Sequence, residues 1–171
     1  SSHEGEEFGA RALILVNEKR SATAIANGYV EVFSLSAKDF KNILNPNLIE
    51  YFKKKFYLED NTIELKDLDN LKELGQGNFG FVNLIRSRKN KQLYAIKALR
   101  LKQIKREKLE VCVDLEKSVL LKIDHPFIMK LVKYFKNEHY IFFLMEYIRG
   151  KELWEVIRDI GLLNKTQTQF Y

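Results

Sequence analysis

Apolar and polar positions alternate along residues 92–99, and this period of two predicts a β-strand. One face of the strand carries a lysine between apolar residues: Ala95, Lys97 and Leu99. A helical period follows from Gln103 to Ile123, with a carboxylate on its predicted apolar stripe: Cys112, Val113, Glu116, Val119, Leu120 and Ile123. Because a buried ammonium needs an anion, the strand and the helix predict an ion pair between Lys97 and Glu116.

Turn and capping residues divide the rest of the chain into further elements. Asn27-Gly28 is a strong signal for a β-hairpin, here with strands at 22–26 and 29–35. Ser36 and Asn45 precede helical patterns as N-caps, and Pro46 suits the first position of the second helix. Later patterns predict strands at 65–74, 128–135 and 140–147, a helix between Gly150 and Gly161, and a last helix capped by Asn164.

Three glycines, Gly75, Gly77 and Gly80, follow Leu74 with G-x-G-x-x-G spacing. Glycine lets backbone N–H groups approach phosphate oxygens closely, because it has no Cβ. A dinucleotide-binding fold requires a helix after the glycines, whereas residues 82–85 alternate like a strand. A P-loop requires Gly-Lys-Ser/Thr, which is missing. The pattern therefore predicts that the glycines lie in a strand–turn–strand lid.

Together, the glycine turn, the Ala-x-Lys strand and the helix glutamate resemble the small lobe of protein kinases, in the cyclic-nucleotide-regulated, basophilic Ser/Thr group. The resemblance implies that the glycines cover the phosphates of ATP. It also implies that Lys97 binds the α- and β-phosphates and that Glu116 holds Lys97 in place. Lys97 and Glu116 are the expected catalytic residues.

The same resemblance extends to the adenine and ribose. It implies that Met145 lies behind the adenine and that the backbone of Glu146 and Ile148 pairs with the adenine edge. Glu152 matches a carboxylate that contacts the ribose and a substrate arginine; the alternative is a first-turn carboxylate that interacts with the helix dipole. The expected nucleotide-binding residues are Leu74, Gly75, Gly77, Gly80, Val82, Ala95, Lys97, Met145, Glu146, Ile148 and Glu152.

A second resemblance lies near the N-terminus. Phe-Gly-x-x-Ala-Leu followed by Arg-Ser-Ala-Thr resembles the phosphate-binding cassette of cyclic-nucleotide-binding domains, which precede the kinase lobe in cGMP-dependent protein kinases. It implies a site formed by Gly9, Ala12, Arg20, Ser21 and Ala22, in which Arg20 and the Ala22 amide hold the cyclic phosphate and Ser21 favours cGMP. Ala10 replaces the usual ribose-binding glutamate, which would weaken cGMP binding. The alternative is a surface arginine at a turn.

Charge divides the 171-residue chain in two. The chain has a net charge of +6; residues from Leu71 onward carry 20 Lys and Arg against 11 Asp and Glu, and the earlier residues are net acidic. We expect an α+β chain, with the C-terminal part of a cyclic-nucleotide-binding β-barrel and its trailing helices at 1–57 and a linker at 58–67. A kinase small lobe follows at 68–171, with a five-stranded antiparallel sheet, the helix that carries Glu116, and the start of the large lobe.

Several classes of partner are not expected. The basic residues are interpreted as solvated faces, not as a nucleic-acid surface, and Lys53-Lys54-Lys55 as a solvated turn. No apolar run approaches the roughly 18 residues of a membrane span, and the acidic start is unlike a signal peptide. Cys112, expected as a reduced core thiol, favours a cytoplasmic location. The histidines lack partners at ligand spacing, so we expect no metal–protein site.

The expected activity belongs to an intact parent protein. The chain has no His-Arg-Asp, Asp-Phe-Gly or Ala-Pro-Glu motif, so we expect it to lack the proton acceptor and the Mg²⁺ ligands and to be inactive alone. We expect the parent to use ATP and Mg²⁺ to phosphorylate serine or threonine near basic residues, switched on by cGMP. The alternatives are a truncated or non-catalytic kinase-like regulatory or scaffold protein, and an unrelated nucleotide-binding module.

Overall fold

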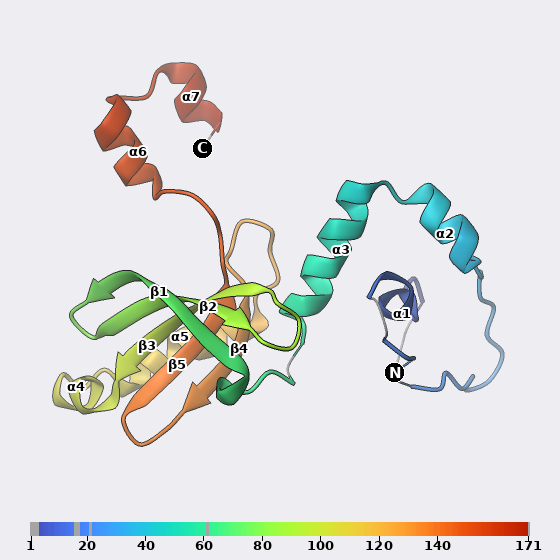
Figure 1. Cartoon of the computed structure of the whole chain (residues 1–171), viewed down its shortest axis with the longest axis horizontal. Coiled ribbons are helices and arrows are strands. Elements are labelled where there is room, and N and C mark those ends of the chain that lie inside the picture. The colour runs from blue at the N-terminus through green and yellow to red at the C-terminus, as the bar shows by residue number, and fades with distance from the viewer. Residues whose placement is uncertain (1–3, 16–17, 21, 61, 171) are drawn as a thin grey trace.

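The computed structural model describes residues 4–15, 18–20, 22–60 and 62–170, and Figure 1 shows their arrangement. The N-terminal helices are α1 (Ala10–Ile14), α2 (Ala37–Ile43) and α3 (Pro46–Leu58). The 3₁₀ turn η1 (Leu65–Asp67) leads into β1 (Leu68–Gly77), β2 (Gly80–Ser87), β3 (Leu93–Arg100), α4 (Leu101–Arg106) and α5 (Glu110–Lys122). The chain continues through β4 (Leu131–Lys136), β5 (Tyr140–Glu146), α6 (Leu153–Ile160) and α7 (Lys165–Phe170).

Within the described residues the strands form one five-stranded antiparallel sheet in the order β1-β2-β3-β5-β4. This confirms the predicted sheet. The central strand β3 pairs with β2 on one side and with β5 on the other. Its neighbours place Val82 opposite Lys97, and Met145 opposite Ala95. These pairs fix the positions of the residues expected to bind nucleotide.

Each face of the sheet carries its own apolar cluster. On the face covered by α4 and α5, the buried residues are Leu99, Ile104, Val113, Leu131, Ile141, Phe143 and Met145. On the opposite face they are Ile63, Ile85, Tyr94, Ile96 and Leu144. The alternation predicted for β3 is therefore confirmed, since its odd and even positions enter different clusters. Ile63, which precedes η1, is completely buried on the second face, so the residues before the sheet cover that face.

The predicted caps of the N-terminal helices are confirmed. The Ser36 side chain accepts a hydrogen bond from the amide of Asp39, and the Asn45 side chain accepts one from the amide of Leu48. Pro46 occupies the first turn of α3, as expected. The much shorter α1 packs beside α3, where Arg11 Nη1 donates to the Phe56 carbonyl at 3.3 Å. The N-terminal region is therefore attached to α3 by a specific contact.

The predicted hairpin at Asn27-Gly28 is not formed, because the described residues between 22 and 35 contain no strand. Their apolar side chains lie in solvent, and Phe33 is 100% exposed. A two-stranded hairpin without a third strand or a packed helix is marginal in water, which accounts for the difference. The expected barrel is accordingly not seen in the described residues.

The predicted helix from Gln103 to Ile123 is interrupted, which corrects the sequence interpretation. Residues 107–109 separate α4 from α5, and Lys108 there has a left-handed φ of 56°. The predicted apolar stripe is only partly correct: Val113 is buried and Leu120 packs against the core, whereas Cys112 and Val119 are exposed. Cys112 is therefore not a core thiol. The sequence pattern could not distinguish neighbouring positions on a helix that buries so few of them.

Two predicted strands begin three residues later than expected. Residues 65–67 form η1, so β1 begins at Leu68. The strand predicted from residue 128 begins at Leu131, because the Ile128 amide donates to the His125 carbonyl at 3.0 Å and closes a turn. Among the described helices, none combines the length and apolar character needed to cross a membrane.

Candidate functional site

The three glycines lie at the turn between β1 and β2, as the sequence predicts. Gly77 and Gly80 face each other across the two strands. A Cβ on Gly80 would lie 1.7 Å from the carbonyl oxygen of Ala98 on β3, so this position requires glycine for packing alone. A Cβ on Gly75 or Gly77 would meet no atom within 4 Å. Of the three glycines of this turn, Gly75 and Gly77 therefore leave open space for a bound group.

The predicted ion pair is confirmed. Lys97 Nζ on β3 lies 2.7 Å from Glu116 Oε1 on α5. Val113, one turn earlier on α5, is buried against the sheet and directs Glu116 toward β3. The two side chains are 31% and 39% exposed, so the pair is half-buried and open to solvent on one side. The ammonium is thus held in place while it stays accessible to an anion.

A cavity of about 320 Å³ lies under the glycine turn, on the side of Lys97. The predicted site residues that line it are Gly75, Gly77, Gly80, Val82 and Lys97. Leu99 and residues from the turn, Gln76, Asn78, Phe79 and Phe81, complete its wall. A fixed ammonium below a glycine turn gives this cavity positive charge and room for close backbone contact, which are the two properties that bind a phosphate.

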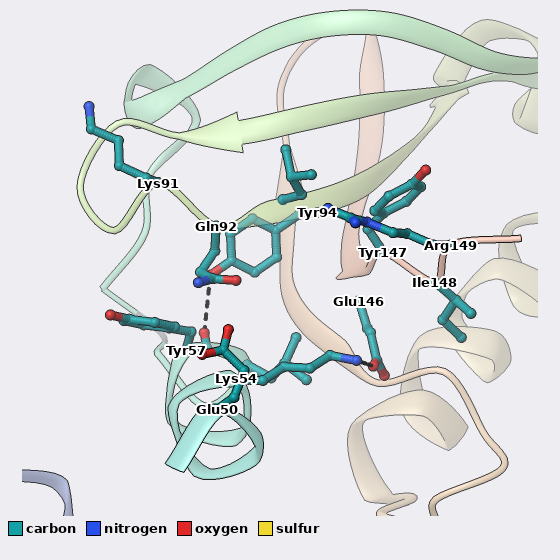
Figure 2. Close-up of a pocket in the computed structure, with 12 residues that line it drawn as sticks. Glu50, Lys54, Tyr57, Lys91, Gln92, Tyr94, Glu146, Tyr147, Ile148 and Arg149 are labelled. Atoms are coloured by element: carbon teal, nitrogen blue, oxygen red, sulfur yellow. Dashed lines mark hydrogen bonds and ion pairs between the residues drawn. The ribbon is translucent and has the colours of Figure 1, made fainter. Parts of the chain in front are cut away.

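The other expected nucleotide-binding residues are distributed along β1, β3 and β5. Ala95 and Met145 are buried cross-strand neighbours on the same face as Lys97. Leu74 is partly exposed on β1, before the turn. Glu146 ends β5, and with Ile148 it lines a second pocket of about 540 Å³ behind the strand (Figure 2). The sheet therefore brings together the residues expected to bind the phosphates, whereas Glu146 to Ile148, which we call the hinge, lie at and beyond the end of β5.

Glu152 is not brought to the glycine turn. It precedes α6 as the N-cap residue, and α6 lies apart from the sheet at the end of an extended segment (Figure 1). Its amide donates a hydrogen bond to the carboxylate of Glu155 at 3.4 Å. This position fits the alternative expected from the sequence, a carboxylate at the start of a helix.

The residues expected to bind a cyclic nucleotide are partly assembled. Gly9 is the N-cap of α1 with a φ of 90°, and Ala12 lies within the same helix. The guanidinium carbon of Arg20 lies 4.0 Å from the position that a Cβ on Gly9 would take, so these two residues are adjacent. Ala22 is exposed outside any strand, and Ser21 lies outside the described residues.

The site suits the phosphates of a nucleotide. The Lys97 ammonium and the open space at Gly75 and Gly77 suit an anion. Among the described residues, no group of three His, Cys, Asp or Glu side chains could hold a metal. No Mg²⁺ ligands are therefore assigned within this part of the chain.

Comparison with known proteins identifies the family to which the chain belongs. The protein kinase domain family matches residues 68–171, which include the whole sheet, the glycine turn and the ion pair. The chain belongs to the protein kinase family. The kinase match begins at the first residue of β1, so the helices α1 to α3 precede it.

Relatives of this kinase chain include cGMP-dependent protein kinases. The chain is 34% identical to the cGMP-dependent protein kinase of Eimeria tenella and 33% identical to that of Plasmodium berghei, in each case over 96% of its length. It covers 16% and 19% of those two proteins. It is also 36% identical to human cAMP-dependent protein kinase catalytic subunit PRKX, over 63% of the chain and 30% of that protein. The chain thus spans less than a fifth of the cGMP-dependent relatives.

Sequence reasoning missed one group of residues around the hinge. Lys54, interpreted as part of a solvated turn, lies on α3 and pairs with Glu146, with Nζ 2.5 Å from Oε1. The Tyr94 hydroxyl on β3 donates to the Tyr57 carbonyl at 3.2 Å. The run of three lysines gave no signal that one of them faces a carboxylate about ninety residues later. Figure 2 shows these side chains around the second pocket.

Proposed function

We propose that the intact protein containing this chain transfers the γ-phosphate of ATP to serine or threonine residues of other proteins. The observation that carries the proposal is the Lys97–Glu116 pair, 2.7 Å apart beneath an open glycine turn. Phosphoryl transfer depends mainly on positioning and on stabilising negative charge, and this pair supplies both at the phosphate end. The match to the protein kinase domain family supports the same function.

Each residue of the site has a separate task in this proposal. Lys97 holds the α- and β-phosphates, Glu116 keeps the Lys97 ammonium directed into the cavity, and Gly75 and Gly77 admit the phosphates to the backbone. Ala95 and Met145 shape the apolar wall for the adenine, and the backbone at Glu146 and Ile148 pairs with its edge. Mg²⁺, when bound in the intact protein, neutralises charge on the phosphates.

The test is a phosphoryl-transfer assay of the intact protein with a peptide that carries serine beside basic residues. Removal of one charge-stabilising group from such a site lowers turnover by about a hundredfold or more, so Lys97→Met should do the same. Lys102→Met is the matched control, because Lys102 is an exposed lysine on α4, outside the cavity. Full activity in Lys97→Met, or equal loss in both variants, would exclude the proposed role. An inactive native protein that still binds ATP would favour a non-catalytic scaffold.

We further propose that cGMP regulates the intact protein through Arg20. The adjacency of Arg20 and Gly9 supports a phosphate contact at the start of α1, and relatives named cGMP-dependent protein kinase support the choice of ligand. A charge-assisted hydrogen bond contributes about 1.5–3 kcal/mol, so Arg20→Ala should weaken cGMP activation about ten- to hundredfold. Lys19→Ala, its exposed neighbour, should leave it unchanged. A native protein that responds to neither cGMP nor cAMP would refute this regulation.

A further inference from the structure

The C-terminal half of α3 lies against the end of the sheet where the hinge begins (Figures 1 and 2). Two polar contacts join them. Lys54 Nζ lies 2.5 Å from Glu146 Oε1, and the Tyr94 hydroxyl donates to the Tyr57 carbonyl at 3.2 Å. Lys54 and Tyr57 are one helical turn apart, so a single face of α3 makes both contacts. We call these two contacts the α3 clamp.

The two strand residues in the α3 clamp are partners in the sheet. Tyr94 on β3 lies directly opposite Glu146 on β5. The next pair along, Ala95 and Met145, lies on the opposite face, the same face as Lys97. By holding both members of the first pair, α3 fixes how β3 and β5 meet immediately beside the second pair. The wall expected to contact adenine is therefore positioned from behind by α3.

The strand residues of the α3 clamp are largely buried. Tyr94 is 1% exposed, and its hydroxyl also accepts a hydrogen bond from Asn90 Nδ2 at 3.0 Å. Burial raises the pKa of Tyr94 to about 12, so its hydroxyl remains a donor at physiological pH. The Glu146 side chain is only 17% exposed, whereas Lys54 is 53% exposed. Loss of Lys54 would leave the more buried partner, Glu146, without its cation.

The segment after α3 extends the same attachment across the back of the sheet. Ile63 is fully buried in the cluster that contains Tyr94, and Leu58 and Leu65 pack against that cluster. Lys89, in the loop between β2 and β3, donates to the Thr62 carbonyl at 3.1 Å. The contact of α3 is thus continuous with the packing of the residues that follow it, and α3 is held at a fixed place on the lobe.

We propose that Lys54 is a positioning residue for the hinge: through its ion pair with Glu146, α3 sets the conformation of the end of β5 and thereby the nucleotide affinity of the kinase lobe. The claim about nucleotide affinity rests on the proposed function. The claim about the conformation of β5 does not, because it applies without any ligand. Lys54 itself contacts no nucleotide in this proposal and acts only through Glu146.

The experiment measures amide hydrogen exchange in the 171-residue chain without nucleotide. The reporters are the amides of residues 145–149, among which Glu146 donates to the Lys130 carbonyl at 2.9 Å. Lys54→Glu should raise their exchange rates about 1.5-fold to fivefold, as expected for loss of a partly exposed ion pair. Lys55→Glu is the matched control, since it makes the same charge change one residue along on an exposed position of α3.

Charge reversal separates positioning from general destabilisation. Glu146→Lys alone should also raise exchange, whereas the double variant Lys54→Glu with Glu146→Lys should restore most of the protection. In Lys54→Arg, which keeps the positive charge, these amides should exchange at the native rate. The inference is overturned if the amides of residues 145–149 exchange at the same rate in Lys54→Glu and Lys55→Glu. It is also overturned if those amides exchange as fast in the double variant as in the faster of the two single variants.

ATP titration of the same variants keeps this inference distinct from the proposed function. If the native chain binds ATP, Lys54→Glu should weaken that binding by a factor similar to the change in exchange. If the native chain fails to bind ATP, the proposed nucleotide site fails, while the exchange data still decide whether α3 positions the hinge. If ATP binds equally well to native and Lys54→Glu chains whose exchange rates differ, the claim about nucleotide affinity is overturned.

Discussion

Replacement of Gly80 by alanine tests the close approach of β2 to β3 at the glycine turn. The new Cβ would lie 1.7 Å from the Ala98 carbonyl oxygen and 2.8 Å from its carbonyl carbon, which are backbone atoms that cannot rotate away. The strands must separate there, which strains the Gly80–Leu99 pair and the neighbouring hydrogen bond from the Arg100 amide to the Phe79 carbonyl, 2.8 Å long.

The magnitude follows from two opposing effects. Overpacking of this kind costs about 1–3 kcal/mol. The reduced entropy of the unfolded chain returns about 0.4–1 kcal/mol when glycine becomes alanine. For a lobe of this size, a net loss of about 1–2 kcal/mol corresponds to a fall in Tm of roughly 5 to 15 °C. Gly80→Ala should therefore melt well below the native chain.

Gly77→Ala is the matched control, because a Cβ there would meet no atom within 4 Å. It should melt within a few degrees of the native chain. If Gly77 lets the phosphates approach the backbone, Gly77→Ala should also bind ATP more weakly, even though its stability is nearly unchanged. Thermal unfolding followed by circular dichroism measures the first effect, and calorimetric titration the second. Equal melting temperatures for Gly80→Ala and Gly77→Ala would refute the reasoning.

Two further predictions concern the pKa of Tyr94 and the solvent exposure of Cys112. Because the pKa of Tyr94 is raised to about 12, its neutral phenol stabilises the folded chain below pH 10, and this stabilisation should decline as the pH rises from 10 toward 12. The difference in unfolding free energy between the native chain and Tyr94→Phe should shrink over that range; a constant difference would contradict the burial argument. Cys112 is exposed on α5, so it should react with a thiol reagent about as fast folded as unfolded. Strong protection in the folded state would contradict its position.

The sheet and its ion pair could be predicted from the sequence because their signals are local and redundant. The period of two in β3, the glycine spacing and the glutamate on the following helix all depend on neighbouring residues. The family resemblance then relates them to one another. The capping residues Ser36 and Asn45 were equally predictable, since each acts on an amide three residues away.

The errors occur where distant contacts decide the structure. The break at Lys108 and the narrower buried face of α5 depend on which residues reach the core, and the buried Val113 is flanked by exposed positions. The prediction of a hairpin at Asn27-Gly28 was wrong, because no third strand or helix packs against these residues in the described part of the chain. The pairing of Lys54 with Glu146 joins residues 92 positions apart, and nothing in either local sequence indicates it.

The central claim, that Lys97 and the glycine turn form a nucleotide phosphate site, is tested most directly by an NMR titration of the chain with ATP. The Lys97–Glu116 pair is partly exposed and contributes about 1 kcal/mol or less, so Lys97→Met should fold with little change in stability. In the native chain and in Lys102→Met, ATP should shift the amide signals of Gly75, Gly77 and Val82, and in Lys97→Met these shifts should be lost. Shifts that persist unchanged in Lys97→Met, or that fall only outside the turn, would contradict the account.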